Sequence, residues 1–132
     1  TLSDLYIGAD IVDVGRVKAS LDNYSAKFVN KVFSLEEQEY CNSKSNPEIH
    51  YSGRFAAKEA IIKAIKSSGF DQKFSLKNIK IINHSDGSPY VKLDFKCKGD
   101  IKVSISHIQT HAVAFAILNI NSWWDSSLKV NP

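Results

Sequence analysis

Residues 53–69 read GRFAAKEAIIKAIKSSG, and this stretch decides the fold class of the 132-residue chain. Its apolar side chains recur every three or four positions, which is typical of an amphipathic helix packed against a core. The apolar stripe consists of Phe55, Ala56, Ala60, Ile61, Ala64 and Ile65. Ser67-Ser68-Gly69 then supplies residues that commonly end a helix. We therefore expect a well-defined helix in this stretch.

The residues before this helix predict a strand and two further helices. Over Leu5–Val14, apolar residues recur at every second position from Leu5 to Ile11, and branched residues are dense around Gly8, which predicts a strand. Apolar residues three and four positions apart predict a helix over Val17–Phe28. Ser34 followed by Glu37 forms a capping box, which marks the start of the next helix.

The residues after the helix predict antiparallel strands. Alternating residues place strands at 76–83 and 90–95, joined by the turn-forming residues 85–89. A second pair of strands is expected at 101–106 and 112–120. Helices early and antiparallel strands late indicate an α+β domain, with helices packed on an antiparallel sheet.

Length and composition agree with a single compact domain. We expect residues 1–120 to form it and residues 121–132 to form a C-terminal tail. The chain is 43% hydrophobic and 23% charged, which excludes a wholly disordered protein. No apolar run approaches the roughly 20 residues that span a bilayer, and the start does not resemble a secretory signal. We therefore expect no membrane contact and a cytoplasmic protein, or one of a plastid-type organelle in a eukaryote.

The charge of the chain bears on its partners. A net charge of +3 is well short of the dense basic face of a dedicated nucleic-acid binder. The lysines are spread along the chain and the aromatic residues mostly occupy apolar stripes, so a weak nucleic-acid binder ranks last among the candidate functions. The charge does suit an anionic ligand or partner.

Two carboxylates are candidate metal ligands. Asp10 lies where the first strand ends, beside Gly8, and a small residue there lets a ligand approach the backbone closely. Glu59 lies on the helix quoted above and has Lys63 one turn on. Each has an ordinary alternative: Asp10 or Asp13 caps the following helix, and Glu59 with Lys63 forms a surface ion pair.

His107 and the basic residues of the quoted helix are candidates for an anion site. His107 follows an alternating strand and precedes a turn, from which an imidazole can point into a cleft; a hydrogen-bonded polar histidine is equally ordinary. The cationic side of the helix suits phosphate, although most such charge runs are solvated faces. That side comprises Arg54, Lys58, Lys63 and Lys66. These residues favour a small α+β domain with a carboxylate-bound divalent metal and cationic groups around a phosphate ligand.

Two segments, taken together, resemble the two signature motifs of the 4'-phosphopantetheinyl transferases. They are GADIVDVGR at residues 8–16 and GRFAAKEAIIKA at residues 53–64. Within that superfamily the chain resembles the short holo-acyl-carrier-protein synthase type. Three more segments in the family's order reinforce the likeness: Ser34–Glu37, Gly87-Ser88-Pro89 and Val103–His107.

The resemblance implies the 4'-phosphopantetheinyl transferase fold and an enzyme of fatty acid and lipid biosynthesis. It would transfer the 4'-phosphopantetheine group of coenzyme A to a serine of apo acyl carrier protein and release adenosine 3',5'-bisphosphate. The resemblance also implies Mg²⁺ as cofactor, held by Asp10 and Glu59. Mg²⁺ prefers oxygen ligands and commonly uses one or two carboxylates together with substrate phosphates.

The resemblance further implies roles for individual residues. Lys63 would bind the phosphates and stabilise charge on the pyrophosphate, while Arg54 and His107 would contact coenzyme A. Glu59 would remove the serine proton, directly or through a water. Arg16 would lie at the start of the helix that receives the carrier protein, an acidic partner; a solvated positive face is its ordinary alternative.

The resemblance also implies a homotrimer with coenzyme A sites at the subunit interfaces. Longer members of the superfamily carry two copies of the domain, whereas this chain carries one. The late strands at 101–105 and 112–120 are apolar enough to leave a face for such an interface.

The chain departs from the family at three places. Ser88 stands where the family usually has a Lys, residues 66–69 replace a Gly-x-Gly, and residues 123–132 have no counterpart. The alternative function is a non-catalytic module that binds nucleotide or an acidic protein, in which Asp10 and Glu59 are structural.

Overall fold

The structure is a computed structural model that describes residues 4–120. Its elements in chain order are β1 (Leu5–Asp13), α1 (Val14–Val32), α2 (Leu35–Asn42), α3 (Pro47–Ser67), the 3-10 turn η1 (Leu76–Asn78), β2 (Ile79–Asn83), β3 (Pro89–Leu93), β4 (Asp100–His107) and β5 (His111–Asn119). The predicted tail, residues 121–132, lies outside the described residues, so the boundary at residue 120 stays a prediction.

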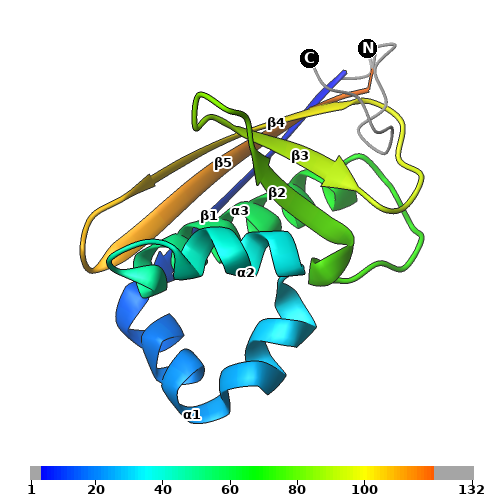
Figure 1. The fold of residues 1–132 in the computed structure, drawn as a ribbon. Helices are drawn as coiled ribbons and strands as arrows, with labels where there is room; N and C mark the ends of the chain where they lie inside the picture. Colours follow the sequence, from blue (N-terminus) through cyan, green and yellow to red (C-terminus); the bar gives the residue numbers. More distant parts are fainter. Residues whose placement is uncertain (1–3, 121–132) are drawn as a thin grey trace.

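The predicted α+β class with an antiparallel sheet is confirmed. In the described part of the chain, three strands form a sheet in the order β1-β5-β4, and β2 pairs with β3 in a separate hairpin. α3 lies against the three-stranded sheet, and α1 and α2 pack on α3 (Figure 1). The quoted helix is therefore the central element of the molecule, with the sheet on one side and the other two helices on another.

α3 approaches the sheet closely because both surfaces carry small side chains. The buried small residues are Gly8, Ala112, Ala114 and Ala116 on the strands and Ala56, Ala57, Ala60 and Ala64 on the helix. A Cβ at residue 8 would lie 2.9 Å from the Ala64 nitrogen and closer still to the Ala60 carbonyl oxygen. The expectation that Gly8 admits a ligand is thus wrong, because the backbone of α3 takes that space.

The ends of α1 differ from the prediction. The helix begins at Val14 because the Asp13 carboxylate accepts a hydrogen bond of 3.2 Å from the Arg16 backbone N–H. Asp13, and not Asp10, is therefore the cap that the ordinary alternative required. Ser25 interrupts the helix with a left-handed φ of 39°.

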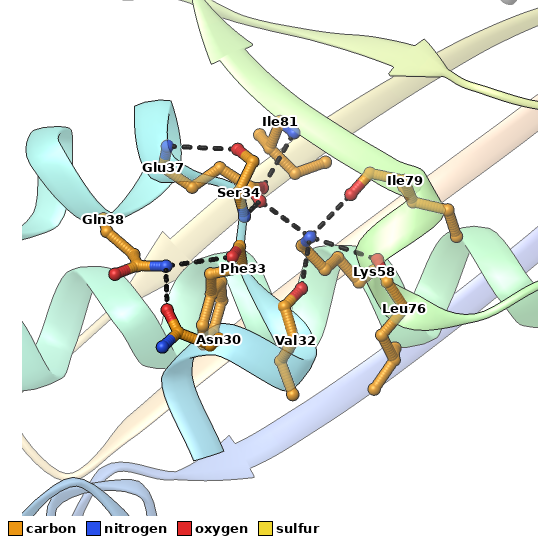
Figure 2. Close-up of polar contacts among 10 residues, drawn as sticks. All are labelled: Asn30, Val32, Phe33, Ser34, Glu37, Gln38, Lys58, Leu76, Ile79 and Ile81. Carbon is orange, nitrogen blue, oxygen red and sulfur yellow. Dashed lines mark hydrogen bonds and ion pairs between the residues drawn. The ribbon is translucent and has the colours of Figure 1, made fainter. Parts of the chain in front are cut away.

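The capping box of α2 is confirmed and has a second use. The Ser34 N–H donates to Glu37 Oε1 at 2.9 Å, and the Glu37 N–H donates to the Ser34 hydroxyl at 3.3 Å. The same carboxylate accepts from the Ile81 N–H at 2.9 Å and from the Lys58 ammonium at 2.8 Å. Glu37 thus connects α2 to β2 and α3 (Figure 2).

Lys58 is fully buried, so the prediction that places it on the cationic side of the helix is wrong. Its ammonium donates to the Glu37 carboxylate and to three backbone carbonyls, all of which Figure 2 shows. The carbonyls belong to Val32 at 2.8 Å, Leu76 at 3.1 Å and Ile79 at 2.6 Å. Burial lowers the pKa of Lys58, and the adjacent Glu37 opposes that shift. Arg54 is buried as well, so only Lys63 and Lys66 of the predicted side are exposed.

The three-stranded sheet leaves an apolar face exposed. The large hydrophobic residues on it are Leu5, Ile7, Ile11, Phe115 and Ile117, of which Ile7 is 72% and Phe115 is 58% exposed. On β4 the residues that share this face are polar, Lys102, Ser104 and Ser106. The prediction is thus confirmed for the strand at 112–120 and wrong for that at 101–105; β1 supplies the remaining apolar residues. No helix in residues 4–120 has the length and apolar character needed to cross a bilayer.

Candidate functional site

Asp10 and Glu59 line one hollow next to the end of β1. The cavity has a volume of about 370 Å³ and lies between β1, the first turns of α1 and the middle of α3. Asp10 lies on the same face of β1 as Gly8 and the buried Val12, so its side chain is directed to the α3 side of the sheet. Because Gly8 lets α3 come close, carboxylates 49 positions apart in the chain meet in one cavity.

Lys63 also belongs to this group. Its ammonium donates to Asp10 Oδ1 at 3.2 Å and to the Ala9 carbonyl at 2.9 Å. The ion pair thus joins α3 to β1, whereas the ordinary alternative paired Lys63 with Glu59 on the helix surface.

The electrostatics of Glu59 reflect its neighbours. Partial burial raises the pKa of Glu59, and the Asp10 carboxylate raises it further, while Lys63 and Lys66 lower it. A cation between two neighbouring carboxylates favours the ionised form of both. A carboxylate whose pKa is raised also holds a proton more readily than an ordinary glutamate.

The donor set suits a hard divalent cation. Asp10 and Glu59 supply carboxylate oxygens to one cavity, and Mg²⁺ is commonly held by one or two carboxylates with substrate phosphates and water. In residues 4–120 no group of three or more His, Cys, Asp or Glu side chains could hold a metal, so an all-protein cage of the zinc type is absent from this part of the chain. The residues present therefore fit Mg²⁺.

Arg16 lies at the rim of the same cavity. Its side chain is exposed and lines the hollow together with the carboxylates. Phe28 and Phe55 form an apolar part of the wall, with ring centroids 6.3 Å apart. Phe55, expected in the apolar stripe, is thus only partly in the core and partly at the site.

Arg54 and His107 form a second group, distinct from the carboxylates. The Arg54 guanidinium stacks over the Tyr40 ring at 3.9 Å and donates to the Asn83 side chain. The ring centroids of Tyr40 and His50 lie 5.9 Å apart, and those of His50 and His107 are separated by the same distance. The structure therefore brings Arg54 and His107 to one cluster of rings and cations.

One atom of this cluster has no partner. Arg54 is only 5% exposed, and among the described residues its Nε has no hydrogen-bond acceptor. A buried guanidinium donor without a partner is unfavourable unless a ligand or water completes it. This observation supports an anion next to Arg54.

His50, Tyr40 and Asn83 are cluster residues that the sequence reasoning missed. No periodicity marks them, because they lie on three separate elements. Burial lowers the pKa of His50, and the nearby His107, Lys44 and Arg54 lower it further, while Glu48 raises it.

Of the three departures from the family, residues 123–132 lie outside the described residues, and the other two are local. In the hairpin turn the Asp86 carboxylate accepts from the Ser88 N–H at 2.9 Å and from its hydroxyl at 2.6 Å, and these bonds lower the pKa of Asp86. After α3, Gly69 has a φ of 90°, which only glycine adopts without strain. Neither change touches Asp10 or Glu59.

Comparisons with known proteins agree with this geometry. A family model described as the 4'-phosphopantetheinyl transferase superfamily matches residues 6–117. A holo-(acyl-carrier-protein) synthase of Thermodesulfovibrio yellowstonii is 46% identical over 113 residues, covering 85% of this chain and 96% of that protein. One of Protochlamydia amoebophila is 39% identical over 118 residues, covering 86% and 96%. The crystal structure of a Bacillus anthracis holo-(acyl-carrier-protein) synthase in complex with CoA (3',5'-ADP) matches with a TM-score of 0.73 and 30% identity, covering 86% of this chain and 94% of that one.

Proposed function

As a member of the 4'-phosphopantetheinyl transferase superfamily, the chain is a holo-(acyl-carrier-protein) synthase, and we propose which of its residues perform the transfer. The reaction moves the 4'-phosphopantetheine group of coenzyme A to a serine of apo acyl carrier protein, with adenosine 3',5'-bisphosphate as the leaving group. The observation that carries the assignment is the cavity in which Asp10 and Glu59 meet, with Lys63 bonded to Asp10.

In this proposal Asp10 and Glu59 hold Mg²⁺. Both carboxylates line one cavity, and each comes from a rigid element, which keeps their separation fixed. When bound, Mg²⁺ supplies neutralising charge to the pyrophosphate of coenzyme A. The Lys63 ammonium, 3.2 Å from Asp10 Oδ1, adds a second positive charge beside the proposed metal site.

Arg54 and His107 contact coenzyme A in this proposal. The Arg54 Nε, which has no acceptor within residues 4–120, and the exposed imidazole of His107 belong to one cluster, which suits the anionic groups of a nucleotide. Glu59 accepts the proton of the attacking serine in this proposal, directly or through a water.

The proposed reaction is tested by mass spectrometry. The protein is incubated with coenzyme A, Mg²⁺ and an apo carrier protein, and the carrier is examined for the mass of one phosphopantetheine group. A carrier whose target serine is replaced by alanine serves as the control. If coenzyme A binds but a competent carrier gains no mass, the alternative function, a non-catalytic binding module, replaces this one.

Loss of either carboxylate is expected to abolish transfer without unfolding the protein. We expect Asp10→Asn and Glu59→Gln each to lower turnover by about a hundredfold or more. Each variant removes one carboxylate that would hold Mg²⁺, and with it the cation that neutralises the reacting phosphates. Steady-state rates with saturating coenzyme A measure the loss. Near-normal turnover in either variant would remove that residue from the site.

The stability of Glu59→Gln supplies the matched control. The folded-state pKa of Glu59 is raised above its ordinary 4.5. Between the ordinary pKa and the raised pKa, Glu59 is ionised in the unfolded chain but still protonated in the folded one. The wild type therefore loses stability as the pH rises through this range, and the glutamine variant does not. We expect the variant to be at least as stable as the wild type at pH 7, with the difference disappearing below the ordinary pKa.

Arg16 is proposed to receive the acidic carrier protein at the rim of the cavity. A rim charge acts mainly on encounter, so Arg16→Glu should raise the KM for the carrier roughly tenfold at low salt and leave the affinity for coenzyme A nearly unchanged. Kinetics at two salt concentrations check this. A fall in coenzyme A affinity instead would assign Arg16 to the nucleotide site.

A homotrimer with coenzyme A sites at the subunit interfaces is also proposed. The exposed apolar face of β1 and β5 supports it, because faces of this kind usually mark an interface. Ile11 belongs both to that face and to the lining of the cavity, so a neighbouring subunit on the face would lie beside the site. Sedimentation equilibrium should give three times the 14.7 kDa of one chain. A concentration-independent monomer that still catalyses transfer would contradict the shared site.

A further inference from the structure

Lys63 and a metal ion would bind the same carboxylate, that of Asp10. The Lys63 ammonium lies 3.2 Å from Asp10 Oδ1, and the Ala9 carbonyl fixes it there at 2.9 Å. The Asp10 side chain is only 20% exposed, which limits the directions from which a cation can reach its oxygens. The Lys63 side chain is 54% exposed and is therefore free to leave along the solvent side.

We propose that Lys63 competes with the divalent cation for Asp10, so that the binding of coenzyme A, by attracting Lys63 to its phosphates, strengthens metal binding. This inference rests on the proposed function, because it assumes that the cation and the coenzyme share the cavity of Asp10 and Glu59. It concerns the order and coupling of binding, which the assignment of ligands does not determine.

The coupling follows from charge and geometry. A cation at Asp10 must replace the ammonium or bind beside it, and two positive charges within a few ångströms disfavour each other. A phosphate offers Lys63 an alternative partner of greater charge than one carboxylate. Once Lys63 bonds to phosphate, the Asp10 oxygen is available and the repulsion is offset by the ligand's negative charge. By linkage, the metal strengthens coenzyme A binding by the same factor.

Lys66 provides a matched control on the same helix. Lys63 and Lys66 both act on the charge of Glu59, and both side chains are exposed. The described ion pair to Asp10 comes from Lys63. Replacing either lysine by methionine removes one positive charge from the same region, but only Lys63→Met removes the competitor for the metal ligand.

The test is isothermal titration calorimetry, in which Mg²⁺ is titrated into the wild type, Lys63→Met and Lys66→Met. Each protein is measured with and without saturating coenzyme A. Without coenzyme A, we expect Lys63→Met to bind Mg²⁺ about three- to tenfold more tightly than the wild type, and Lys66→Met to differ by less than about twofold. Coenzyme A should tighten Mg²⁺ binding in the wild type more than in Lys63→Met. Circular dichroism confirms that each variant is folded.

Three outcomes would overturn the inference. The first is equal Mg²⁺ affinity in the wild type and Lys63→Met, and the second is an equal increase in Mg²⁺ affinity over the wild type in Lys63→Met and Lys66→Met. The third is no Mg²⁺ binding to any of the three proteins. The transfer assay on the wild type separates this failure from that of the proposed function. Wild-type transfer with either of the first two titration results removes the coupling alone. Transfer without Mg²⁺ binding also removes the proposed metal site, and absence of transfer removes the function.

Discussion

Lys58→Met should destabilise the folded protein by about 3–5 kcal/mol, because the variant leaves the Glu37 carboxylate buried without a counter-ion. Lys58 and Glu37 are both fully buried and their charged groups lie 2.8 Å apart. The variant also removes the donor to the carbonyls of Val32 and Ile79, which then lie in the interior without it. Urea denaturation at pH 7 measures the free energy of unfolding.

A double-mutant cycle shows whether the ion pair is the cause. Glu37→Gln keeps an acceptor for one of the N–H groups of Ser34 and Ile81 but removes the charge. The double variant Lys58→Met/Glu37→Gln should therefore be less destabilised than the sum of the two single variants. Strict additivity, or a loss below about 1 kcal/mol for Lys58→Met, would show that the pair contributes little.

Gly8→Ala should destabilise the protein by about 1–3 kcal/mol and lower the transfer rate at least tenfold. The added methyl group would meet the Ala60 carbonyl and lie 2.9 Å from the Ala64 nitrogen, both of which are backbone atoms of α3. The helix must therefore move away from β1. Since Glu59 is on the helix and Asp10 on the strand, the distance between the carboxylates changes with it.

Gly53→Ala is the matched control for that experiment. Its added Cβ would lie 3.0 Å from the Cγ2 methyl group of Ile105, which is a side-chain contact, whereas the atoms that a Cβ at residue 8 would meet belong to the backbone of α3. Alanine is also a better helix former than glycine by about 1 kcal/mol. We expect this variant to be nearly as stable as the wild type. Gly8→Ala with wild-type stability and turnover would mean that the contact between α3 and β1 adjusts without consequence.

Periodicity and capping were sufficient to predict the order of helices and strands. The apolar stripe of α3 and the Ser34–Glu37 capping box depend on residues close in sequence, so their pattern survives in the sequence alone. The strands over 101–106 and 112–120 are present with ends moved by one residue for the same reason.

Contacts between distant residues could not be predicted in this way. Lys58 is the same residue type on the same helix as the exposed Lys63 and Lys66, and its burial depends on acceptors from Val32, Leu76 and Ile79. Gly8 lies near Asp10, a candidate metal ligand, and was expected to leave space for a bound molecule, but α3 fills that space. Likewise, the sequence paired Asp10 with Glu59 only through the family resemblance. The packing of α3 against β1 places both residues in one cavity.

If the proposed trimer forms through the exposed face of β1 and β5, the stability of the protein depends on its concentration. Ile7, Phe115 and their neighbours gain free energy only when another surface covers them, and that gain depends on the concentration of the covering partner. In the proposed trimer the partner is the chain itself, so dilution lowers the melting temperature and the fraction of complete sites together. Specific activity measured at nanomolar enzyme would then fall below that measured at micromolar enzyme, even though each molecule has the same sequence and fold.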